Sequence, residues 1–118
     1  MPNVDYDISF HCADRLQERV GLSKSQKSQE AFLKKVKERG ISIKNIPKSE
    51  KLYKLLNNYC KDRQEGTYAI YFSNYVVIFT ESNIAVTVLN ANDNLIKCVK
   101  NYCKRRHIDG CYTSKKIS

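Results

Sequence analysis

Three side chains near the N-terminus have types and spacing suited to acid–base chemistry on a phosphodiester. His11, Arg15 and Arg19 follow one another at intervals of four residues, so in a helix all three project from one face. An imidazole takes and returns a proton near neutral pH, and a guanidinium holds a phosphate through two parallel hydrogen bonds. This set suits cleavage of RNA by its own 2′-hydroxyl, which needs proton transfer and charge stabilisation but no metal.

A solvated helix face has the same pattern. An apolar stripe of Ala13, Leu16 and Val20 lies on the opposite side of this helix, and arginines opposite such a stripe commonly point to water. Asp14 and Glu18 are also near enough in the sequence to form ion pairs with the arginines. The spacing alone therefore leaves a catalytic and a structural interpretation open.

Hydroxyl groups in the predicted strands form a second set of candidates. Thr87 lies within IAVTVL at 84–89, where its hydroxyl could bind a phosphate oxygen, although threonine is also an ordinary strand residue. Tyr68, Tyr71 and Tyr75 could stack on bases of a single strand, yet aromatic pairs across strands stabilise sheets equally well. We interpret most of these tyrosines as structural.

Five basic residues near the C-terminus predict a phosphate-binding surface at the end of the last helix. Cations at a helix C-terminus also interact favourably with the helix dipole, and the two roles are compatible. The residues are Lys97, Lys100, Lys104, Arg105 and Arg106.

Four residues in the same region have the ligand types that zinc favours. Cys98, Cys103, His107 and Cys111 read C-x4-C-x3-H-x3-C. Structural zinc sites usually use a C-x2-C knuckle on a turn, whereas Cys98 and Cys103 lie in a predicted helix, where Cys98 can be a small buried residue. With five cysteines and no export signal, we expect reduced thiols. Because the spacing does not match a zinc knuckle, we expect no metal and no cofactor, and zinc stays an alternative.

The charge of the chain is segregated along the sequence. The formal net charge is +9, with 21 Lys and Arg against 12 Asp and Glu. Residues 24–63 hold twelve basic and four acidic groups, residues 97–118 hold seven and one, and residues 64–96 contain no Lys or Arg. This balance favours RNA or another polyanion as the partner through phosphate neutralisation, although lysines also keep proteins dispersed.

The sequence gives no sign of a membrane segment. No apolar run approaches the roughly 20 residues that a membrane span needs. The opening MPNVDYDISF lacks the basic and apolar regions of an export signal. We therefore expect a cytoplasmic protein that has no membrane partner.

Hydrophobic periodicity and turn residues predict an α+β protein. Apolar spacings of three and four residues indicate helices, and β-branched and aromatic runs separated by short polar turns indicate strands. The helices are expected at 10–20, 29–39, 50–61 and 93–105, and the strands at 67–72, 75–80 and 84–89. We predict N-terminal helices packed on one face of a small antiparallel β-meander, with a C-terminal helix. We expect residues 1–118 to form a single domain, with 113–118 as a loose basic tail.

Caps and core positions follow from the same pattern. Gly21 ends the first helix, and Asn92 caps the last one. In the helix at 29–39 we expect Ala31, Phe32 and Val36 to face the core.

Two stretches of the chain carry a resemblance to a known group of enzymes. ISFHCADRLQER near the N-terminus and TYAIYFSNYVVIFTESNIAVTVL further on resemble the small bacterial and phage members of the barnase/EndoU/colicin/RelE-like ribonuclease superfamily. The resemblance implies an α+β fold whose antiparallel sheet cups a phosphate-binding cleft. It also implies metal-independent RNA cleavage in toxin or phage–host conflict settings. His11 would match the motif histidine, Arg15 and Arg19 its arginines, and Thr87 the threonine of the closing strand.

One departure from that pattern opens an alternative. The predicted strands carry no Lys or Arg, whereas RelE-like enzymes often place catalytic basic residues on the sheet. The first hypothesis is therefore a RelE-like, metal-independent endoribonuclease with a cognate antitoxin or host protein as its protein partner. The alternative is a non-catalytic basic module, such as a phage regulator or inhibitor, that binds nucleic acid or protein. The lysine-rich stretch at 44–61 could itself be an added binding element.

Overall fold

The centre of the molecule is an antiparallel sheet of four strands in the order β1-β2-β3-β4. The computed structural model describes residues 10–21, 26–61 and 66–106, without the side chains of Phe10, His11 and Gln26. The expected tail at 113–118 lies outside the described residues. The strands are β1 (Ile41–Ser42), β2 (Thr67–Phe72), β3 (Tyr75–Thr80) and β4 (Ala85–Asn90).

Helices surround this sheet, which confirms the α+β class and the C-terminal helix. Within the described ranges, no helix is long and apolar enough to cross a membrane. The helical elements are α1 (Phe10–Arg15), the π-helix η1 (Leu16–Val20), α2 (Gln26–Arg39), the 3-10 turn η2 (Ile43–Asn45), α3 (Lys51–Cys60) and α4 (Asp93–Arg106).

The helix termini and turns follow the local sequence. Gly21 has a φ of 84° and ends η1, its N–H donating to the carbonyl oxygen of Leu16, which is the predicted C-cap. The side-chain oxygen of Asn92 accepts a 2.8 Å hydrogen bond from the backbone N–H of Leu95, so Asn92 caps α4 as predicted. Ser73 and Asn74, both at positive φ, form the tight turn between β2 and β3.

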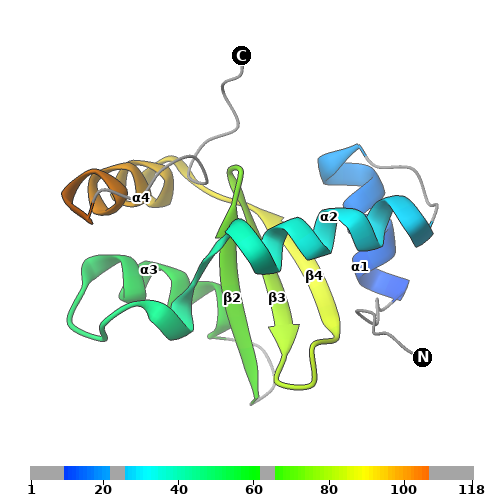
Figure 1. Ribbon diagram of the computed structural model, residues 1–118, viewed down its shortest axis with the longest axis horizontal. Coiled ribbons are helices and arrows are strands. Elements are labelled where there is room, and N and C mark those ends of the chain that lie inside the picture. The colour runs from blue at the N-terminus through cyan, green and yellow to red at the C-terminus, as the bar shows by residue number, and fades with distance from the viewer. Residues whose placement is uncertain (1–9, 22–25, 62–65, 107–118) are drawn as a thin grey trace.

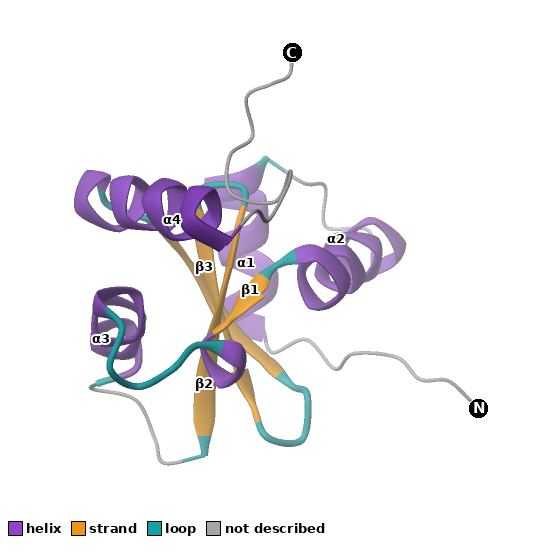
Figure 2. Cartoon of the chain, turned by 60° about the vertical axis from the view of Figure 1, so that its left-hand side comes forward, coloured by secondary structure: helices purple, strands orange, loops and turns teal. Residues whose placement is uncertain are grey.

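The helices are divided between the two faces of the sheet. Phe32 of α2 makes edge-to-face contacts with Phe72 and Tyr75, so α2 covers the face that carries these rings. Figure 2 shows α1 and α2 on this side and α3 and α4 on the other. The central residues of β2 and β3, 68–71 and 76–79, are all buried because both faces are covered. The sequence pattern predicts helices on one face of the sheet, whereas in the structure α3 and α4 form a second layer on the other face.

Helix α2 differs from its prediction in phase and in length. It begins at Gln26 rather than 29, and its buried positions are Gln29, Leu33 and Val36. Ala31 is exposed, so the prediction that it faces the core is wrong. The reason is geometric: a residue two positions from both Gln29 and Leu33 lies on the opposite side of the helix.

A close approach of two chain segments explains the glycine that follows α2. A Cβ on Gly40 would lie 2.5 Å from the carbonyl oxygen of Val36 and 2.9 Å from that of Tyr71. Here α2 turns directly into β1, which pairs with β2 through Ile41 and Ser42. The sequence analysis missed β1 because a two-residue strand has no measurable periodicity.

Candidate functional site

The two arginines of the predicted set, Arg15 and Arg19, have different partners. His11 lies in α1, and its side chain is outside the described part of the structure. Nη1 of Arg15 lies 2.7 Å from Oε1 of Glu18, an exposed ion pair within one turn. This pairing is the one that the structural interpretation anticipated.

Arg19 is attached to the sheet. Its Nη1 donates a 2.9 Å hydrogen bond to the backbone carbonyl oxygen of Val88 in β4. The hydroxyl of Tyr75 in turn donates to the carbonyl oxygen of Arg19 at 3.1 Å. These two contacts hold η1 against the sheet, so the Arg19 side chain has a structural role in this arrangement.

Thr87 lies on the other side of the sheet from α1 and η1. It pairs with Ile78, and Val88 pairs with Val77. Val77 and Tyr75 are two residues apart, so they lie on the same face of β3, and this is the face against η1 because Tyr75 bonds to it. Ile78 and its partner Thr87 therefore lie on the other face, toward α3 and α4. Thr87 is 1% exposed, and its hydroxyl oxygen has no hydrogen-bond partner among the described residues. The structure therefore does not bring Thr87 together with the arginines.

A β-bulge is responsible for the position of Thr87. The register of β4 against β3 shifts between Ile78 and Phe79, so Ala85 pairs with Phe79 while Thr87 pairs with Ile78. Ile78 and Phe79 are neighbours in one strand and point to opposite faces. In a regular strand Ala85 and Thr87 would lie on the same face, but across this bulge they lie on opposite faces.

Helices α3 and α4 form an antiparallel pair (Figure 1). Glu50 at the start of α3 makes ion pairs of 3.2 Å with both Arg105 and Arg106 at the end of α4. At the opposite end, the hydroxyl of Tyr59 accepts a 3.0 Å hydrogen bond from the backbone N–H of Asn92. Hydrogen bonds from Arg105 and then from Arg106 lower the pKa of the Glu50 carboxyl. Two of the five predicted phosphate-binding cations are thus bound to a carboxylate.

The lysines of helices α3 and α4 are exposed to solvent. In α4, Lys97, Lys100 and Lys104 recur at intervals of three and four residues, opposite the buried Leu95 and Val99. We define the basic face as the exposed lysines on the solvent side of α3 and α4. It consists of Lys51, Lys54, Lys61, Lys97, Lys100 and Lys104.

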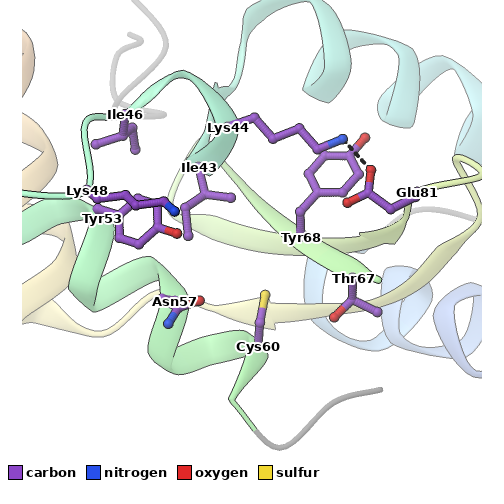
Figure 3. A pocket seen from close by; sticks show the side chains of 10 residues that line it. All are labelled: Ile43, Lys44, Ile46, Lys48, Tyr53, Asn57, Cys60, Thr67, Tyr68 and Glu81. Atoms are coloured by element: carbon purple, nitrogen blue, oxygen red, sulfur yellow. Dashed lines mark hydrogen bonds and ion pairs between the residues drawn. The ribbon is translucent and has the colours of Figure 1, made fainter. Parts of the chain in front are cut away.

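A pocket of about 320 Å³ opens at the edge of β2, beside α3 (Figure 3). It lies at the outer edge of β2, beyond the end of β1, since β1 pairs with β2 through Ile70 and Tyr71. Tyr53 and Lys48 lie on one side, and Tyr68, Lys44 and Glu81 lie on the other. The lining residues are Ile43, Lys44, Ile46, Lys48, Tyr53, Asn57, Cys60, Thr67, Tyr68 and Glu81.

Most of the charge on the Tyr68 side is internally compensated. Lys44 lies 2.5 Å from Glu81 and 4.1 Å from the centre of the Tyr68 ring. The hydrogen bond to Glu81 raises the pKa of Lys44. Tyr68 also stacks on Phe79, and its hydroxyl accepts a hydrogen bond from Lys37. This side therefore forms a polar wall in which Lys44 and Glu81 are paired with each other.

The sequence analysis did not predict this pocket. The stretch at 44–61 was marked as an added binding element, and it contributes most of the lining. The spacing of Tyr53, Asn57 and Cys60 was the available signal, because these residues share one flank of α3.

The structure describes only two of the four residues of the possible zinc site. Cys98 is half-buried and Cys103 is buried in α4, while His107 and Cys111 lie outside the described residues. Burial raises the pKa of the Cys98 thiol. No group of three or more His, Cys, Asp or Glu suited to a metal occurs in the described ranges. The zinc alternative stays a prediction.

Comparisons of this chain with protein-family models, with curated proteins and with solved structures found no match.

Proposed function

We propose that this protein is an RNA-binding module that contacts phosphates through the basic face of α3 and α4. The supporting observation is the concentration of exposed lysines on two adjacent helices. Among the described residues of these helices and their caps, the acidic groups are Glu50, already paired with two arginines, and Asp93. A surface with this excess of cations binds polyanions by releasing counterions from phosphates.

The arrangement of the sheet also favours this function over chemistry on the sheet surface. Helices cover both faces of β2 and β3, and residues 64–96 contain no Lys or Arg. The Arg19 side chain is hydrogen-bonded to the carbonyl oxygen of Val88, and Thr87 lies on the face of the sheet away from Arg19. The cations available to a phosphate are instead on the outer helices.

The test is the salt dependence of RNA binding by two matched double variants. Lys97→Gln with Lys100→Gln removes two charges from the basic face, and Lys34→Gln with Lys35→Gln removes two exposed charges from α2. We measure binding of a fluorescent single-stranded RNA by anisotropy over a range of salt concentrations. The first variant should lose about 1.4 units of the slope of log affinity against log salt. Equal losses in both variants would contradict a role for the basic face.

Cleavage of bound RNA is a second candidate function. The observation that favours it is the four-residue interval between His11 and Arg15 within α1, which sets them one turn apart. Wild type and His11→Ala are incubated with mixed RNA in EDTA, and both cleavage and retention are followed. Cleavage by wild type alone would establish a metal-independent ribonuclease centred on His11. Retention without cleavage by both proteins would support a binding module.

A further inference from the structure

We propose that the pocket beside α3 receives an unstacked base of single-stranded RNA, stacked on Tyr53 and hydrogen-bonded to Asn57. This inference rests on the proposed function, because the strand that supplies the base would be held by the basic face. It adds base contacts to a surface that would otherwise bind only phosphates.

Tyr53 is the aromatic ring available for stacking. Its side chain extends from α3, is half-buried and lines the pocket. The Tyr68 ring is already occupied, by Phe79 at a centroid distance of 5.8 Å and by Lys44 at 4.1 Å. A base that enters the pocket therefore stacks on Tyr53 and meets Tyr68 only as the opposite wall.

Asn57 supplies the hydrogen bonds that a base edge requires. It follows Tyr53 by four residues, so the two side chains are neighbours on one flank of α3 (Figure 3). A side-chain amide offers donors and an acceptor together, which matches the edge of an unpaired base. Pockets for small ligands usually start at about 300 Å³, so this cavity suits one nucleotide better than two.

The pocket is continuous with the basic face. At 100° per residue, Lys54 and Lys61 lie on the flank of α3 directly beyond Asn57, on the side away from the buried Leu52 and Leu56. Lys48 borders the pocket itself and is exposed. A strand that turns one base toward Tyr53 can therefore keep its neighbouring phosphates beside these lysines.

The first test compares RNA with inorganic polyphosphate, which has the charge but no bases. The variants are Tyr53→Leu, which keeps an apolar side chain, and Asn57→Ala, with Asn58→Ala as the matched control on the adjacent exposed position. Tyr53→Leu should weaken RNA binding about tenfold. Asn57→Ala should weaken RNA binding severalfold. Both should leave polyphosphate affinity unchanged, and Asn58→Ala should change neither. Equal losses for RNA and polyphosphate in the pocket variants would overturn the inference.

A second readout separates this inference from the proposed function. Cys60 lines the pocket and Cys98 is a half-buried thiol outside it. Adenosine and uridine monophosphates are added during alkylation by iodoacetamide, and each peptide is followed by mass spectrometry. A bound nucleotide should slow modification of Cys60 and leave Cys98 unchanged. Failure to bind either polyanion, with Cys60 protected, would overturn the proposed function and would show that the pocket takes a free nucleotide instead of a base of RNA. Polyanion binding without protection of Cys60 and without a specific loss of RNA binding in the pocket variants would overturn the pocket alone.

Discussion

The guanidinium of Arg19 donates a 2.9 Å hydrogen bond to the carbonyl oxygen of Val88, across 69 positions of the chain. It ties the π-helix that follows α1 to the last strand of the sheet. We therefore expect this residue, which its spacing in the sequence suggested as a phosphate ligand, to contribute to stability.

Arg19→Ala should destabilise the fold by about 1–3 kcal/mol, since it removes a charge-assisted hydrogen bond from a half-buried carbonyl. Arg15→Ala is the matched control, because its exposed ion pair with Glu18 should contribute less than about 1 kcal/mol. Urea denaturation followed by circular dichroism gives both values. Equal destabilisation by the two variants would contradict a specific role for the Arg19 contact.

Thr87→Val should leave stability unchanged or raise it by up to about 1 kcal/mol. The two side chains have nearly the same shape, and the buried hydroxyl of Thr87 finds no partner in the described structure. Thermal unfolding of the two proteins measures the difference. A loss of more than about 1 kcal/mol would show that the hydroxyl makes a bond that the described residues do not provide.

Gly40→Ala should destabilise the protein by about 1–3 kcal/mol, because a Cβ there would press on the carbonyl oxygens of Val36 and Tyr71. Gly66→Ala is the comparison. Gly66 has a φ of 82° and open space around it, so its substitution should cost about 1 kcal/mol from backbone conformation alone. Denaturation midpoints of the two variants show which substitution is more destabilising. A larger effect at Gly66 would argue against close packing at Gly40.

Acid should weaken the contact between α3 and α4 through Glu50. Its pKa is lowered from the ordinary 4.5 in the folded state by Arg105 and then Arg106, so the folded protein holds this proton less tightly than the unfolded chain. The stabilisation is therefore present above pH 4.5 and is lost as the pH falls through the lower folded value. Glu50→Gln should lower the thermal midpoint at neutral pH, and the difference from wild type should shrink in acid. A difference that is constant with pH would exclude this linkage.

Much of the secondary structure could be predicted because it depends on neighbouring residues. The strands β2 and β3 have the predicted bounds, since β-branched and aromatic runs end at Ser73 and Asn74, which accept positive φ. The cap of α4 by Asn92 is equally local. By contrast, the core face of α2 was predicted wrongly at Ala31, because α2 packs through Gln29 and Leu33, and Ala31 lies on the opposite side of the helix.

Three features could be inferred from the order of residues alone: the α+β class, the concentration of lysines outside the strands and the helical interval between His11 and Arg15. Three others depend on how the elements pack: Arg19 is bound to Val88, Thr87 lies on the face of the sheet away from Arg19, and η2, α3 and the edge of β2 line one pocket. The physical reason is that periodicity describes a segment relative to its own axis. Which segments meet depends on long-range packing and on a single bulge that shifts the register of β4.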